Sequence, residues 1–276
     1  MSPAAASERC KEAASRMLFR NVDAANERGR AAGVAAVKAA RQRGAAVINR
    51  GAGTMPVGAA APNGGERYTL LEDPPDAPAP RWDALHDGTK TSDGKLCFAD
   101  APEFTPSLTP AECIRKGIFG GCYFNPRGGK AGIFSRDIAI DHAEFPAEWF
   151  EADESLYLSR RYNVMTNAYR VKSGFGQREW ESKGWIHAQD PRGWFQWYCR
   201  FFCGRRSADD ARQIARWRAC ASSRGRWRNQ LCGAVQRGSG RWDDVAVSPV
   251  IRQTLLHWAY ELSSADYADW RAAKGK

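Results

Sequence analysis

The chain has 276 residues, and its 43% hydrophobic content with eleven tryptophans is enough to bury a sizeable core. No apolar run reaches the roughly eighteen residues of a transmembrane helix, which argues against a membrane-spanning protein and predicts a soluble one. The net charge of +10 favours acidic partners. The eight cysteines follow no secretory signal and form no CxxC pair, so we expect reduced thiols inside the cell, in a compartment that the sequence does not distinguish.

The N-terminal part changes composition twice. Residues 1–65 are rich in Ala, Gly and Arg, and no acid occurs between Arg28 and Gly65. We expect a basic, disordered tail here, because its apolar residues are mostly alanines that are too small to dock firmly. An organelle-targeting segment is the alternative, although the four acids before residue 28 count against it. Residues 66–103 are acidic and rich in proline, which predicts a spacer.

A compact, mainly α-helical domain with little regular sheet is predicted over residues 104–270. Thr109 and Glu112 form a capping box around a proline at the first helical position, and Gly117 is expected to end this helix. The next stretch, residues 118–129, contains four glycines but matches neither a P-loop nor a dinucleotide-binding fingerprint. We therefore predict a tight turn that its aromatic residues pack.

Asp141, His142 and Glu144 form the most enzyme-like cluster of the sequence. A carboxylate beside an imidazole can serve acid–base or metal chemistry. Neighbouring residues on a loop usually point in different directions, however, and a structural role is the reading we favour. Two short helices are predicted after this cluster, over residues 145–150 and 177–183.

An aromatic helix is predicted over residues 191–203. Asp190 is a favoured N-cap residue, Pro191 suits the first helical position, and Gly204 allows the left-handed conformation that ends a helix. Aromatic rings cover nearly half of the helix circumference, which indicates a helix wedged between neighbours in the core. A stacking surface for bases is the alternative, and it would need exposed rings. The rings belong to Trp194, Phe195, Trp197, Tyr198, Phe201 and Phe202.

A second helix is predicted over residues 208–221, directly after a capping box. Because the connection is only four residues long, the two helices predict a helical hairpin or helix-turn-helix unit over residues 191–221. Arg212 and Arg216 lie one turn apart on the outward face, a spacing that suits a phosphate backbone. In the alternative reading, Asp209 pairs with Arg212 in an ordinary solvated ion-pair face.

Basic residues accumulate over residues 178–241, where fourteen Lys or Arg face five acids, a balance of +9. Arginine offers a planar fork for phosphate oxygens, and its mixture with tryptophan is typical of nucleic-acid surfaces. The best single candidate is the stretch in which Arg224, Arg226 and Arg228 surround Trp227. Arginine-rich codon usage would give the same composition without a function, and this alternative stays open.

Two further helices are predicted at the C-terminal end. The first begins at Ser248 and Pro249, and Ser264 caps a last short one. His257 lies off the apolar stripe of the first helix and is therefore expected to be exposed. The stripe consists of Ile251, Leu255, Trp258 and Leu262.

A zinc site is the competing hypothesis for the thiols. Cys199 and Cys203 share a helix face, and Cys220 and Cys232 lie downstream. This spacing matches no common zinc module, and no histidine falls between residues 199 and 232. We therefore expect no metal and no cofactor.

A long block of aromatic and polar motifs consists of Gly184-Trp185, Asp190-Pro191, Gly193 to Tyr198, Gly204-Arg205-Arg206, Gln213-Ile214, Arg216-Trp217, Arg252-Gln253 and His257-Trp258-Ala259-Tyr260. On these motifs, from about Phe104 to Leu262, the chain resembles a family of uncharacterised proteins from algae, fungi and large DNA viruses. Cys203 departs from the pattern of that family, which further weakens a zinc site that uses it. The first hundred residues lie outside the resemblance. Because the family has no established activity, the resemblance implies no mechanism.

The leading functional hypothesis is a nucleic-acid-binding module whose partner is DNA or RNA and not a membrane. Its arginines would form one basic face, and binding would weaken steeply with salt. The hypothesis requires that these arginines are not scattered or paired with acids. The expected binding residues are Arg205, Arg206, Arg212, Arg216, Arg224, Arg226, Trp227 and Arg228.

Two other classes of protein remain as alternatives. An enzyme of unknown class would use a cleft lined by Trp185, His187, Asp190 and His142, which requires the two histidines to converge. No catalytic residue is assigned on this reading. A protein-interaction scaffold would instead expose tryptophans in an apolar patch of several hundred Å².

Overall fold

The computed structural model describes residues 46–49, 54–57, 70–125, 127–129, 132 and 142–275. The basic tail predicted over residues 1–65 lies outside this range, apart from two short antiparallel strands, β1 (Ala46–Asn49) and β2 (Thr54–Val57). None of the helices in the described part of the chain has both the length and the apolar character needed to span a bilayer.

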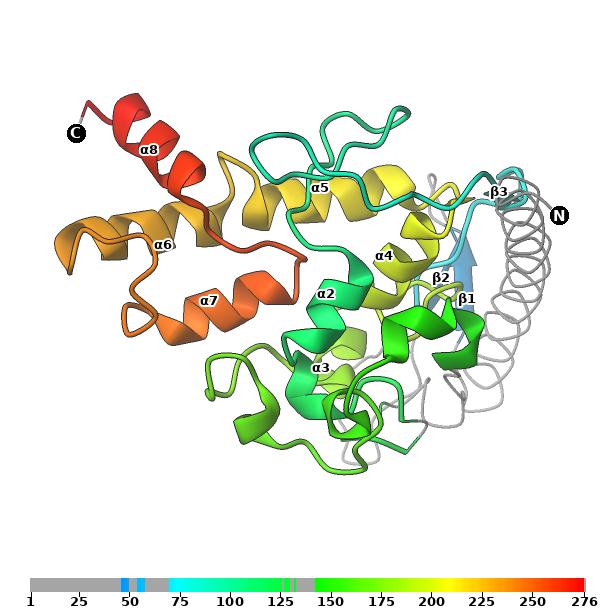
Figure 1. Cartoon of the computed structure of the whole chain (residues 1–276). Helices are drawn as coiled ribbons and strands as arrows, with labels where there is room; N and C mark the ends of the chain where they lie inside the picture. Colours follow the sequence, from blue (N-terminus) through cyan, green and yellow to red (C-terminus); the bar gives the residue numbers. More distant parts are fainter. Residues whose placement is uncertain are drawn as a thin grey trace, which may run out of the picture.

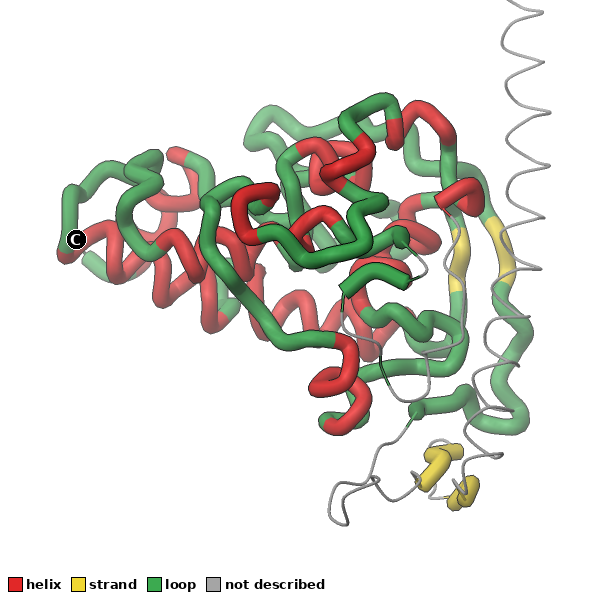
Figure 2. Tube along the Cα trace, turned by 90° about the horizontal axis from the view of Figure 1, so that it is seen from below, coloured by secondary structure: helices red, strands yellow, loops and turns green. Residues whose placement is uncertain are grey.

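The described part is mainly helical, which confirms the predicted fold class (Figure 1). Long loops connect the helices (Figure 2), and a second small sheet pairs β3 (Arg81–Trp82) with β4 (Arg205–Arg206). The α-helices are α2 (Pro110–Arg115), α3 (Gln177–Ser182), α4 (Trp194–Phe202), α5 (Asp210–Ala221), α6 (Arg226–Arg237), α7 (Pro249–Leu256) and α8 (Ser264–Ala273). Short 3₁₀ helices lie at Phe119–Gly121, His142–Glu144, Ala147–Phe150, Glu154–Leu156 and Val164–Thr166.

Helix α2 has the predicted boundaries. The hydroxyl of Thr109 accepts a bond from the backbone N–H of Glu112, and the Glu112 carboxylate accepts one from the N–H of Thr109, at 2.8 Å. Gly117 ends the helix at φ +68°, and a Cβ there would lie 2.0 Å from the carbonyl oxygen of Thr166. The capping box and the terminal glycine are therefore the local signals that define this helix.

The segment before Phe104 belongs to the core. Leu96 is fully buried and Phe98 is buried, although the sequence suggested a spacer over residues 66–103. The ring of Phe98 stacks on that of Phe104 with centroids 5.4 Å apart. A short apolar pair between acidic and proline-rich stretches is a weak signal in sequence, because its partners lie on other elements.

Helix α4 is the centre of the core, as predicted. All nine of its residues are buried, and the Trp197 and Phe201 rings lie 5.5 Å from the ring of Phe104. The predicted start at Pro191 is wrong, because Gly193 adopts φ +82° and ψ −156° and the helix begins at Trp194. Asp190 is consequently not its N-cap.

Helices α4 and α5 are consecutive and are joined through β4. The indole N–H of Trp194 donates to the carbonyl oxygen of Gln213 at 3.2 Å, and that of Trp197 donates to the carboxylate of Asp210 at 2.9 Å. The aromatic face of α4 therefore holds α5 through two hydrogen bonds, and both helices contribute to the same hydrophobic core.

Helices α6, α7 and α8 lie together at one end of the molecule (Figure 1). The sequence did not predict α6, which begins directly after Gly225. Leu231 and Val235 bury its apolar side, and the Arg228 guanidinium pairs with Asp266 of α8 at 2.9 Å. This arrangement places the start of α6 beside the end of α5, where the chain forms a cavity.

Candidate functional site

A cavity of about 580 Å³ lies among α3, the start of α4, α5, α6 and the end of α7. Its lining contains eight large aromatic residues and three arginines but no carboxylate. Such a composition suits a ligand that is both aromatic and anionic. The tryptophans of the lining are Trp180, Trp185, Trp194, Trp227 and Trp258, the phenylalanines are Phe119, Phe175 and Phe195, and the arginines are Arg192, Arg216 and Arg226.

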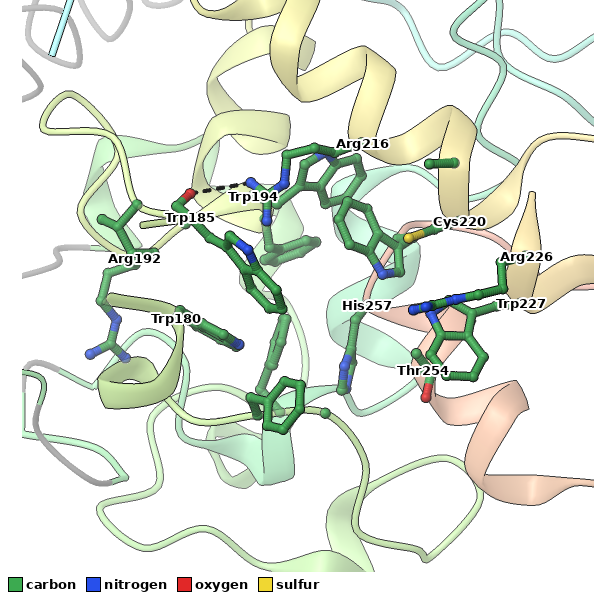
Figure 3. A pocket seen from close by; sticks show the side chains of 18 of the residues that line it. Trp180, Trp185, Arg192, Trp194, Arg216, Cys220, Arg226, Trp227, Thr254 and His257 are labelled. Atoms are coloured by element: carbon green, nitrogen blue, oxygen red, sulfur yellow. Dashed lines mark hydrogen bonds between the residues drawn. The ribbon is translucent and has the colours of Figure 1, made fainter. Parts of the chain in front are cut away.

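The aromatic walls come from segments that are distant in sequence. The rings of Trp194 and Trp258 are 4.9 Å apart and tilted by 50°. In the view of Figure 3, Trp180 and Trp185 border one side of the cavity, and His257 borders the other. Trp180, Trp185 and Trp258 are only half-buried, so part of their surface is open to a ligand.

Arg216 of α5 is a partly buried cation in this wall. Its Nη1 donates to the Gln213 side-chain oxygen at 2.8 Å and to the Trp185 carbonyl at 3.3 Å, which the dashed line in Figure 3 marks. Its Cζ lies 5.7 Å and 5.6 Å from the ring centroids of Trp185 and Trp258. No carboxylate of the described residues forms an ion pair with it.

The pKa of Arg216 is lowered to about 10, because burial disfavours its charge and the nearby Arg212 repels it. The side chain is still protonated near neutral pH. A cation held in this way is stabilised by an incoming anion, which would add to the weaker favourable interaction with Asp209.

Arg226 begins α6 at the other end of the cavity. Its guanidinium carbon lies 4.3 Å from the ring centroid of Trp227, a cation–π contact that leaves the exposed fork available to solvent (Figure 3). Arg224, two residues earlier, is also exposed. Neither side chain forms an ion pair with an acid in the part of the chain that the structure describes.

Arg192 lines the cavity and also binds the backbone of a neighbouring segment. Its Nη2 donates to the Tyr123 carbonyl at 2.7 Å, and its Cζ lies 5.5 Å from the Tyr123 ring. Burial lowers its pKa, and its Nε is buried without a hydrogen-bond partner.

His257 lines the cavity, so the prediction that it is exposed is wrong. Its ring stacks on Phe119 with centroids 4.3 Å apart and an interplanar angle of 15°. Its Nε2 is buried and has no hydrogen-bond partner, and burial lowers its pKa to about 4. The apolar stripe in the sequence of α7 indicated that one side of the helix is buried. The opposite side, where His257 lies, is covered by the turn at Phe119 and the segment at Gly174.

Replacing His257 by glutamine is expected to remove a pH dependence of stability. Between pH 6.5 and 4 the unfolded chain protonates this histidine and the folded protein does not, so the unaltered protein loses stability as the pH falls through this window. The loss amounts to about 2–3 kcal/mol. Urea denaturation of both proteins at pH 7 and pH 4.5 measures this loss. The difference in their free energies of unfolding should change by that amount between the two pH values. A difference that is equal at both pH values would contradict the burial of His257.

Arg205 and Arg206 are engaged within the fold. Arg205 is buried, and its Nη1 donates to the carboxylate of Asp190 at 2.7 Å. The Nε of Arg206 donates to Asp100 at 2.6 Å, and its Cζ lies 3.8 Å from the Phe201 ring centroid. Both residues were expected on a basic face, but their charge is neutralised by acids that are distant in sequence.

Arg212 and Arg228 are paired as well. Nη2 of Arg212 donates to Asp209 at 2.8 Å, which confirms the ion-pair alternative for this turn of α5. Arg228 is buried against Asp266. Of the eight expected binding residues, these two arginines and the two of β4 do not meet the requirement of unpaired charge. Arg216, Arg224 and Arg226 do, and the uncharged Trp227 lies against Arg226.

The residues considered for an enzyme have separate surroundings. His187 is buried, with its Nε2 3.3 Å from Asp73, whereas the ring of His142 lies 5.1 Å from that of Phe150. Asp190 is fully buried; burial favours a higher pKa, but Arg205 and Arg200 outweigh it and lower the pKa. Trp185 of this set lines the cavity, and the other members are absent from its lining. Asp141 lies outside the described residues.

The described residues give little support to the metal hypothesis or to the scaffold hypothesis. Burial raises the pKa of both Cys199 and Cys203, which keeps them as inert thiols. No cluster of three or more His, Cys, Asp or Glu side chains could hold a metal within the described ranges. Trp242 is 37% exposed at the surface.

No family model, no curated protein and no solved structure matches this chain. The resemblance to the algal, fungal and viral family therefore stays a prediction, and the function must be argued from the cavity.

Proposed function

We propose that the protein binds nucleic acid through the arginines and indoles at the cavity. The observation that carries the proposal is the pair of arginines beside open indole rings, Arg216 and Arg226, with the exposed Arg224 two residues before Arg226; none of the three has a carboxylate partner among the described residues. Their forks suit phosphate oxygens, and the ring of Trp227 lies next to them.

This binding surface is smaller than the one that the sequence predicts. Arg205, Arg206, Arg212 and Arg228 neutralise acids of the fold and cannot also neutralise phosphates without breaking those pairs. A short basic surface combined with indoles favours a single strand over a duplex, because stacking on a ring requires an unpaired base face.

The test is the salt dependence of binding to a labelled single strand. We expect the double variant Arg224→Gln/Arg226→Gln to bind more weakly and to show a slope of log affinity against log salt that is shallower by about 1.4 units, or about 0.7 for each phosphate that the variant no longer neutralises. Both side chains are exposed, so the substitution leaves the core intact.

The matched control is Arg241→Gln, which removes an equally exposed arginine that pairs with Asp243 at 3.2 Å. It should leave the slope nearly unchanged. Equal slopes for all three proteins, or no binding of the unaltered chain even at low salt, would refute the proposal. Arg228→Ala is unsuitable as a test, because it would remove a buried side chain and leave the buried Asp266 with Lys95 as its cationic partner.

A further inference from the structure

We propose that the cavity takes a single nucleotide unit, with one unpaired base among the indoles and its phosphate on Arg216 or Arg226. This inference rests on the proposed nucleic-acid binding and deepens it, because it assigns the cavity to one base and its phosphate, whereas surface contacts alone would need no cavity.

Size and shape favour this occupant. The volume of about 580 Å³ lies within the range of pockets that bind small molecules, roughly 300–1,000 Å³. A base pair within a duplex cannot enter such a pocket, whereas an unpaired base can turn out of the strand and place its π-face against aromatic side chains. Trp185 and Trp258 offer half-buried rings for this stacking.

The charge of the lining distinguishes a nucleotide from other aromatic or cationic ligands. Aromatic cages for quaternary ammonium groups depend on the negative faces of the rings. Here Arg216 already lies near two of those faces and would repel a cationic ligand. Because the lining contains no carboxylate, an uncharged ligand would leave this arginine unneutralised. A phosphate attached to an aromatic base satisfies both features.

Among the lining residues, Nε2 of His257 and Nε of Arg192 are buried without a hydrogen-bond partner. The ring of His257 faces the cavity in Figure 3. The hydroxyl of Thr254 is already engaged, since it donates to the Val250 carbonyl at 2.8 Å. A neutral imidazole can donate or accept one hydrogen bond at the edge of a base, which would satisfy the orphaned nitrogen.

The test is calorimetric titration of the full chain with the four 5′-mononucleotides, with adenosine and with ribose 5-phosphate. At least one mononucleotide should bind, and both adenosine and ribose 5-phosphate should bind at least tenfold more weakly than adenosine 5′-monophosphate. Arg216→Gln should weaken mononucleotide binding about tenfold and leave adenosine binding unchanged, which converts to about 1.4 kcal/mol. The exposed Arg226→Gln variant provides a second test should Arg216→Gln fold poorly, and Arg241→Gln is the control.

Two oligonucleotides separate this inference from the proposed function. A single strand and the same strand with every base removed from its central five positions are titrated under equal salt. Weaker binding of the abasic strand supports base capture. If both strands bind equally and no mononucleotide binds, the cavity site is refuted and nucleic-acid binding stands. If mononucleotides bind but neither strand does, the nucleotide site stands and the proposed function is refuted. Equal binding of adenosine and its monophosphate would overturn the role of the arginines.

Discussion

Replacing Arg200 by methionine is expected to lower the free energy of unfolding by about 3–5 kcal/mol, because it leaves the buried carboxylate of Glu144 without its cation and removes one of the two arginines that bind Asp190. Arg200 is 1% exposed, and its Nε and Nη2 bind the two oxygens of Glu144, the latter at 2.9 Å. Its Nη1 lies 3.0 Å from Asp190. Asp190 would keep Arg205, whereas Glu144 would lose both of these hydrogen bonds.

Urea denaturation at neutral pH measures this loss. The control is Arg241→Met, which breaks an exposed pair and should change stability by no more than about 0.5 kcal/mol. Burial without a cation raises the pKa of a carboxyl group above its value in the unfolded chain. Compared with the unaltered chain at the same pH, the variant should therefore be destabilised most at high pH and less at acidic pH. A loss below about 1 kcal/mol would show that this buried network contributes little.

Asp190 shows where local sequence rules succeed and where they fail. An Asp-Pro pair before an aromatic run predicts a helix start, and a helix does follow within a few residues. The same carboxylate is instead bound by Arg200, two turns into the helix, and by Arg205, beyond its end. Nothing local in the sequence indicates that Arg205 turns back toward Asp190, because the geometry depends on the whole helix lying between them.

The candidate site was accessible to sequence reasoning only in part. Arg226 and Trp227 were recognised as an arginine beside a tryptophan, and Arg216 was recognised by its one-turn spacing from Arg212; neither signal needs knowledge of the fold. The same reasoning from local basic charge also selected Arg205 and Arg228, whose acids lie 15 and 38 positions away in the chain. Which arginines stay unpaired is therefore a property of tertiary structure.

Helix α6 was missed for a different reason. Gly225 lies directly before it and Gly233 lies within it, and both glycines lower the helix propensity of this arginine-rich stretch. Packing outweighs this weak propensity, because Leu231 and Val235 are both buried against neighbouring helices. Finding α6 matters for function, since its first turn carries Arg226 and Trp227 into the wall of the cavity.

The second large effect is expected for Trp217, which connects the core to the cavity wall. Its side chain is 1% exposed, and its ring meets that of Phe104 edge-on at 5.2 Å. Its indole N–H donates to the carbonyl oxygen of Trp258 at 2.9 Å. Trp217→Ala should lower the free energy of unfolding by about 3–5 kcal/mol, because it removes buried apolar surface and leaves a void. Trp242→Ala, at a 37% exposed position, should cost far less in the same thermal or urea unfolding measurement.

Trp217→Phe separates packing from positioning. Phenylalanine keeps most of the apolar packing but cannot donate to the Trp258 carbonyl, so the loss of stability should fall to about 1–3 kcal/mol. Ala259, the residue after Trp258, holds a positive φ of 51°, a conformation that neighbouring residues must maintain. Without the bond from Trp217, Trp258 should leave its place in the cavity wall more often, and mononucleotide affinity should fall in a protein that is still folded. A Trp217→Phe variant that loses stability but binds mononucleotides as the unaltered chain does would show that Trp258 is positioned by its other neighbours, such as Trp194.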